Sequence, residues 1–214
     1  MKKILNTIGV NIVLASTVLL FNSCGGFLGF DIIDQGAIDS NLRPKLEEML
    51  GNDLSIIEIS LSEGGGETFS KTITAASVTY FDKEVNDVKA KWITLSGKTE
   101  MKDTRVYKDY KGDDNKLKIS EADTQKLSEI DFSKIAEIVK AAGAMVEKNE
   151  NEFSGIKAYT ITVNSDPEKV KHTFMIQSRL DSKTTTKSGR LATEISYLEF
   201  KFEADAQGNV TMLE

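Results

Sequence analysis

The sequence predicts an α+β protein, in which antiparallel strand meanders carry their helices on one face. Several segments alternate apolar and polar residues with a period of two, as strands with one buried face do. Two other segments place apolar residues at helical spacing. Strands follow strands through short turns rather than through helices, and this is the pattern of antiparallel sheets.

The predicted elements repeat in order: a helix and then three or four strands, in each of two stretches of about 90 residues. Two tandem helix-plus-meander units, lying side by side, account for this order. One wide, curved sheet with both helices on its concave face accounts for it equally well. In either case residues 37–119 hold the first helix and its strands, and residues 120–214 hold the second set.

The first helix is predicted from apolar residues at offsets of four, seven and eight: Leu42, Leu46, Met49 and Leu50. Ser40 or Asn41 caps its start, Pro44 lies in its first turn and Gly51 ends it. The residues before it, 31–36, are predicted to be linker. Three strands follow, around residues 57–61, 69–81 and 88–95, with a bulge or bend at Ala75.

The second half begins with a capping-box pattern at Ser120–Asp123, which predicts a short helix. A longer helix follows behind an Asp131 cap, with an apolar stripe at Ile135, Ile138, Val139, Ala142, Met145 and Val146. Strands are predicted at residues 159–163, 170–180, 195–203 and 210–213. The Thr-rich stretch 183–190 is predicted to be a polar loop.

The N-terminal segment has the composition of a secretory signal peptide. Lys2 and Lys3 form a basic start, residues 4–21 are mostly apolar, and Ser23 is a small residue before Cys24. The apolar core is short for a membrane span, which needs about 20 such residues. We therefore interpret residues 1–23 as a signal peptide and residues 24–36 as a stalk, with glycines after Cys24.

This segment resembles the lipobox of bacterial lipoproteins, although Phe21 and Asn22 stand where that family usually has Leu and then Ala or Ser. Looser boxes of this kind are similar to those of Bacteroidetes lipoproteins. The resemblance implies that Cys24, the only cysteine in the chain, becomes the first mature residue and carries fatty acyl chains such as palmitate. It also implies anchoring in the cell membrane or outer membrane. The lack of acidic residues directly after Cys24 resembles lipoproteins that face the periplasm.

Composition excludes some partners. Without residues 1–23 the chain has 191 residues, with 25 basic against 33 acidic side chains, a net charge of −8. Such a charge argues against nucleic acid as a partner and against a purely electrostatic hold on anionic lipid. With Cys24 used as the anchor, no cysteine remains for a disulfide or a thiolate metal site.

No motif predicts catalysis, a cofactor or a metal. The single histidine, His172, lies in a predicted strand without a nucleophile motif, and we expect it at the surface or half-buried. The acidic cluster around Asp113 lacks the spacing of a calcium loop and is predicted to be a solvated turn. The strand aromatics are expected in the core: Trp92, Tyr197, Phe200 and Phe202. Tyr197 and Leu198 face opposite sides of their strand, so one of the two faces is predicted to line a groove or partner surface.

The body of the chain resembles two groups of cell-envelope proteins by element order alone. Tandem units resemble the PepSY-like and β-lactamase-inhibitor-like proteins, whereas one wide sheet under helices resembles the lipid-carrier lipoproteins, including mycobacterial lipid-binding ones, to which residues 135–163 are similar. Neither resemblance transfers a site residue. We expect a lipid-anchored, non-enzymatic binding module for a protein, peptide or polymer. The alternative is a periplasmic carrier of a lipid or other apolar ligand.

Overall fold

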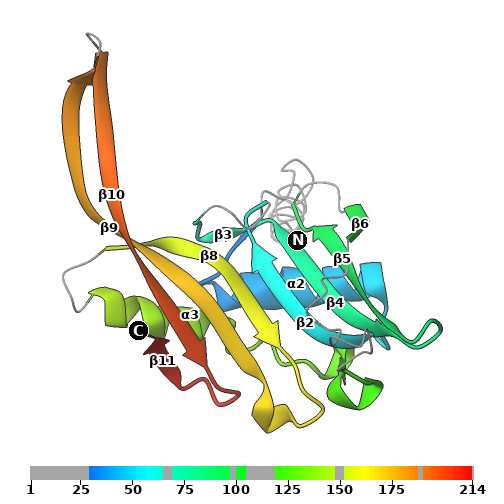
Figure 1. Ribbon diagram of the computed structural model, residues 1–214. Coiled ribbons are helices and arrows are strands. Elements are labelled where there is room, and N and C mark those ends of the chain that lie inside the picture. Colours follow the sequence, from blue (N-terminus) through cyan, green and yellow to red (C-terminus); the bar gives the residue numbers. More distant parts are fainter. Residues whose placement is uncertain are drawn as a thin grey trace, which may run out of the picture.

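A computed structural model describes residues 29–64, 69–96, 100–104, 119–147, 152–187 and 190–213. Cys24 and the predicted signal peptide lie outside this part of the chain, as does the acidic cluster around Asp113. The described residues form an α+β structure, as predicted: a twisted antiparallel sheet with two α-helices packed against it (Figure 1).

The main sheet has nine described strands, which run from one edge to the other in the order β11-β10-β9-β8-β2-β4-β5-β6, with β7 paired to β2. The first half of the chain supplies β2 (Ser55–Ser62), β4 (Ala75–Asp82), β5 (Asp87–Thr94) and β6 (Glu100–Thr104). The second half supplies β7 (Gln125–Lys126), β8 (Glu152–Thr162), β9 (Lys171–Lys187), β10 (Arg190–Ala204) and β11 (Val210–Leu213).

The two halves of the sheet meet at the β2–β8 pair. Ile59 lies opposite Ile161 and Ser60 opposite Thr160, whose hydroxyl donates a hydrogen bond to the Ser60 hydroxyl at 3.1 Å. Backbone pairing therefore continues across the boundary between the two halves, and the described strands form one continuous sheet in addition to a two-stranded sheet of β1 (Phe30–Asp31) and β3 (Thr72–Ile73). The bend expected at Ala75 is the break between β3 and β4.

Helix α2 (Gln35–Leu50) begins earlier than predicted. Asp34 is its N-cap and accepts a hydrogen bond from the Ala37 amide at 3.1 Å, so the predicted caps at Ser40 and Asn41 are wrong. Pro44 consequently lies inside the helix rather than in its first turn. The predicted end is confirmed, because Gly51 has a positive φ of 77° and its amide donates to the Glu47 carbonyl.

The stretch predicted as linker is part of the fold. Phe30 pairs with Ile73 in the small sheet, and Phe30 and Ile32 are both buried in the core. The prediction failed because two isolated apolar residues give no periodic signal, and their burial depends on β3, which lies more than 40 residues away in the sequence.

Helix α3 (Ile135–Glu147) is the predicted second helix, and its predicted stripe is buried except for Met145, which is half-buried. Before it, the capping box at Ser120 and Asp123 is confirmed, but it opens only a 3₁₀ turn, Glu121–Asp123, with a second one at Leu127–Glu129. Arg43 of α2 holds this segment to the helix, because its guanidinium donates to the carbonyls of Leu127, Ser128 and Ile130.

Both helices pack on the same face of the sheet, and they lie behind it in the view of Figure 1. The core lies between them and the sheet. In the second half it is built on aromatic rings: Tyr159 stacks on Phe174 and Phe174 on Phe202, with centroid distances of 5.2 and 5.6 Å. The prediction of Phe202 as core is confirmed, whereas Trp92 and Phe200 are only half-buried.

Strands β9 and β10 extend past the body of the sheet as a hairpin arm, at the upper left of Figure 1. The arm comprises residues 180–187 and 190–195. The predicted loop at 183–190 is therefore wrong for most of its length, because β9 continues to Lys187 and β10 starts at Arg190. Polar residues without apolar alternation carry no strand signal, although their backbones pair along the whole arm.

Candidate functional site

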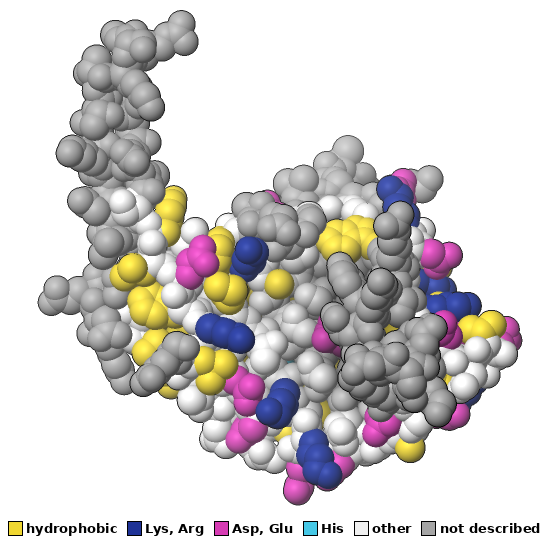
Figure 2. Space-filling view, in the orientation of Figure 1, with side chains coloured by type: hydrophobic (Ala, Val, Ile, Leu, Met, Phe, Trp, Pro, Cys, Tyr) yellow, Lys and Arg dark blue, Asp and Glu magenta, His cyan; other side chains and the backbone are white. Residues whose placement is uncertain are grey.

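The face of β8, β9, β10 and β11 that is turned away from the helices is the first candidate site, and we call it the open face. Register places Met175, Lys201 and Leu213 side by side on it. Tyr197 lies on the same face, two alternations before Lys201 along β10. Figure 2 shows hydrophobic side chains on this side of the molecule at the foot of the arm, with Lys and Arg among them.

A shallow hollow of about 210 Å³ lies in the open face. It forms where β8 is irregular: the register between β8 and β9 shifts between Ile156 and Tyr159, so that Lys157 and Ala158 are both accommodated opposite Met175. Apolar and cationic groups line it together: Lys157, Ala158, Thr160, Thr173, Phe174, Met175 and Lys201. This mixture suits a ligand that offers both apolar and anionic groups.

Tyr197 and Leu198 are exposed by 44% and 37%, so the expectation of Tyr197 in the core is wrong. The sequence-based inference that one face of this strand is left for a groove or partner is consistent with these exposures. A register shift between Ser196 and Tyr197 marks the point where β10 leaves the body of the sheet.

Strand β10 also offers an open edge. Strand β11 pairs only with Lys201–Ala204, so the edge of β10 that faces away from β9 has no described partner strand before Lys201. An unpaired edge presents free backbone N–H and C=O groups, to which an extended peptide can add as a further strand. The open face and this edge together form a surface that can bind a partner by both side chains and main chain.

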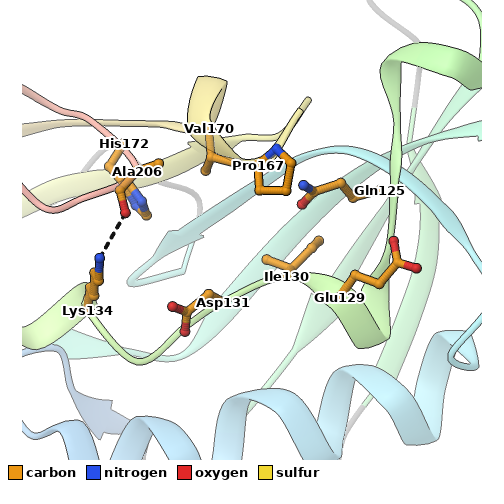
Figure 3. Close-up of a pocket in the computed structure, with 9 residues that line it drawn as sticks. All are labelled: Gln125, Glu129, Ile130, Asp131, Lys134, Pro167, Val170, His172 and Ala206. Carbon is orange, nitrogen blue, oxygen red and sulfur yellow. Dashed lines mark hydrogen bonds between the residues drawn. The ribbon is translucent and has the colours of Figure 1, made fainter. Parts of the chain in front are cut away.

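The second candidate site is a hollow of about 140 Å³ at the opposite end of the sheet (Figure 3). It lies between the 3₁₀ segment before α3 and the turns that follow β8 and β10. Nine residues line it: Gln125, Glu129, Ile130, Asp131, Lys134, Pro167, Val170, His172 and Ala206. The Lys134 ammonium donates a hydrogen bond to the Ala206 carbonyl at 3.0 Å, which closes one side. The hollow is smaller than ordinary ligand pockets, which measure about 300–1,000 Å³.

His172 lies at the inner wall of this hollow and is only 3% exposed, so the expectation of a surface or half-buried histidine is wrong. Its Nδ1 shares a hydrogen bond with the Tyr159 hydroxyl, at 2.9 Å. Burial lowers the pKa of His172 to about 4, with opposing contributions from the nearby carboxylates of Asp131 and Asp205. Burial likewise raises the pKa of Tyr159 well above its usual value. At neutral pH both rings are therefore uncharged, and the pair acts as a satisfied polar contact within the core.

The described residues contain no group of three or more His, Cys, Asp or Glu side chains placed to bind a metal ion. Within the same part of the chain, no helix is long and apolar enough to cross a membrane. The predicted lipidation site, Cys24, lies outside the described residues and stays a prediction.

Sequence reasoning missed His172 although a signal was present. His172 has the same period-two phase as Phe174 and Ile176, which are both buried. The hollow at Lys157 and Ala158 had no such signal, because it depends on a register shift between two strands.

No protein-family model, no curated protein and no solved structure matches the chain. The sites therefore have to be interpreted from their own geometry.

Proposed function

We propose that this protein is a lipid-anchored binding module of the cell envelope that holds a protein, peptide or polymer partner without catalysing a reaction. The anchor is Cys24, acylated after removal of residues 1–23. The partner lies on the open face and along the free edge of β10. The chain faces the periplasm from the cell membrane or the outer membrane.

The observation that carries the partner-binding role is the exposure of Tyr197 and Leu198 at the free edge of β10. Large apolar side chains on both faces of a strand that has one unpaired edge are unfavourable in water unless a partner covers them. Lys157 and Lys201, which line the hollow in the open face, add polar specificity to this surface.

We further propose that the two halves are tandem units, each with one helix and its own meander, joined by the β2–β8 pair. In support, α2 is followed by β2, β4, β5 and β6, and α3 by β8, β9, β10 and β11. Strand order is consistent with this division, because each half occupies one side of the sheet, apart from the two-residue β7, which pairs with β2.

The anchor is tested by growing cells with a labelled fatty acid and comparing the parent with Cys24→Ala. We expect label and membrane association in the parent, and neither in the variant. Equal labelling of the two proteins, or a parent that stays in the soluble fraction, contradicts the anchor.

Whether the protein carries an apolar ligand is tested on material purified from its native host under mild conditions. Organic extraction and mass spectrometry should find no stoichiometric lipid beyond the acyl chains on Cys24. A stoichiometric second lipid would favour the alternative, a carrier of an apolar ligand, and would contradict a partner-binding module.

A further inference from the structure

The arm leaves the sheet at a defined end. The pairing of β9 with β8 stops at Arg179, opposite Glu152, whereas the pairing of β9 with β10 continues to Lys187, opposite Arg190. The eight residues that follow Arg179, 180–187, extend the hairpin by about 27 Å beyond the sheet. Figure 1 shows the arm standing clear of the body.

The chain enters the fold at the same end of the sheet. Strand β1 pairs with β3, which directly precedes the start of β4, where Ala75 lies opposite Ser62, the last residue of β2. Leu61 of β2 pairs with Tyr159 of β8, so this end of β2 is also the end at which β8 begins and the arm departs. Gly29 is fixed there, because a Cβ at this position would lie 2.5 Å from the Ile73 carbonyl oxygen.

The reach of the tether is shorter than the arm. Gly29 is the fifth residue after Cys24, and even a fully extended chain spans only about 18 Å over that length. If Cys24 is acylated, as proposed above, the body is held within this distance of the bilayer surface. An arm of about 27 Å that projects from the same end then reaches the surface.

Charge favours the same orientation. The outer part of the arm, residues 182–193, contains three basic residues, Lys183, Lys187 and Arg190, and no acidic residue, whereas Asp181 and Glu194 lie where the arm leaves the sheet. Five connecting segments lie at the opposite end of the sheet: residues 51–54, 82–87, 120–131, 164–170 and 205–209. Together they contain eleven acidic and three basic residues. An anionic surface attracts the first group and repels the second.

We propose that the outer part of the β9–β10 arm, residues 182–187 and 190–193, binds the anionic phospholipid headgroups of the membrane that holds the anchor. The protein then stands on the bilayer at two points, the acylated Cys24 and the arm. This inference rests on the proposed anchor. The two contacts give the body a fixed orientation. Its acidic end then points away from the membrane, and its open face lies next to the membrane.

The test uses the mature chain from Cys24, which contains every described residue. Because Cys24 is the only cysteine, a maleimide lipid couples the chain to vesicles at that position alone. Vesicles of phosphatidylcholine are compared with vesicles in which one third of the lipid is phosphatidylglycerol. Acetylation of each lysine with a soluble reagent is then followed by mass spectrometry.

We expect Lys183 and Lys187 to react about fivefold more slowly on the anionic vesicles, because one basic residue near an anionic surface changes its affinity by about that factor. The control lysines at the opposite end, Lys83, Lys126 and Lys169, have exposed side chains and should react equally on both vesicles. High salt should abolish the difference.

Equal reactivity of the arm lysines on both vesicles would overturn the proposal. A different result would be that acetylation of the arm lysines slows in the absence of vesicles as the protein concentration rises. That result would also overturn the proposal and would assign the arm to contact with a second copy of the chain. Chemical coupling replaces the cellular anchor, so a failure of acylation in cells is detected by fatty-acid labelling and leaves this measurement unaffected.

A charge variant gives an independent readout. The uncoupled mature chain, with Cys24 blocked, is floated with the anionic vesicles. The triple variant Lys183→Gln, Lys187→Gln and Arg190→Gln should bind less than the parent. The matched control carries Lys83→Gln, Lys126→Gln and Lys169→Gln and should bind as the parent does. Weaker binding of this control would mean that the acidic end contacts the membrane. Equal binding of the arm variant and the parent would contradict the proposal.

Discussion

The two faces of β8, β9 and β10 have opposite properties although alternate residues of the same strands form them. On the helix side, Tyr159, Phe174 and Phe202 stack in a row and are almost inaccessible to water. On the open face, Met175 and Tyr197 lie among lysines and remain partly exposed. Because side chains alternate between the two faces, each strand contributes some residues that stabilise the fold and others that remain available for binding.

The largest expected effect is on the helix side. Phe202→Ala should lower the free energy of unfolding by about 3–5 kcal/mol, because it removes a fully buried ring that stacks on Phe174. Tyr197→Ala, on the open side of the same strand, should cost less than about 1 kcal/mol. Urea unfolding of both variants checks the comparison, and similar losses would show that the open face is part of the core.

His172→Ala should cost about 2–4 kcal/mol, since it leaves a cavity and deprives the Tyr159 hydroxyl of its partner. This exceeds the value expected for a surface histidine. Tyr159→Phe is the matched variant, because it removes the same hydrogen bond while it keeps the ring; about 1–3 kcal/mol is expected. A loss below about 0.5 kcal/mol in both proteins would mean that the pair contributes little to stability.

The buried imidazole of His172 should make the free energy of unfolding depend on pH. Its pKa is about 4 in the folded protein, against about 6.5 when unfolded, so the unfolded state binds more protons between these values. The stability from neutral His172 is complete above pH 6.5 and declines as the pH falls toward 4, by about 3 kcal/mol.

His172→Gln should remove this decline, which chemical unfolding at a series of pH values measures. Glu58 acts in the opposite direction, since burial raises its pKa, but it contributes equally to the parent and the variant. Parallel pH profiles for the two proteins would show that His172 does not titrate as inferred.

The smallest effect is expected from an ion pair on the open face. Lys171 lies 3.3 Å from Glu203, and both side chains are well exposed, so water and salt screen the attraction. Lys171→Ala should change the free energy of unfolding by less than about 1 kcal/mol. A larger loss in thermal unfolding would indicate that this face is covered in the free protein.

The regular parts of the fold could be predicted from the sequence because their buried residues recur at the spacing of a strand or a helix. The stripe of α3 and the short strand β11, at residues 210–213, are placed as predicted. The start of α2 was misplaced because Ser40 and Asn41 are cap-type residues and Pro44 suits a first turn, although Asp34 caps the helix. The arm was missed because its polar residues do not alternate with apolar ones. The hollow at Lys157 was missed because it depends on a register shift between β8 and β9, which local periodicity does not reveal.

Photo-crosslinking in cells tests whether the open face binds a partner. A benzophenone amino acid is placed at Tyr197 on the open face, and in a matched variant at Val85, which is 56% exposed in the turn between β4 and β5. We expect a discrete adduct from position 197 and none from position 85. The same adducts from both positions, or none from position 197, would contradict it.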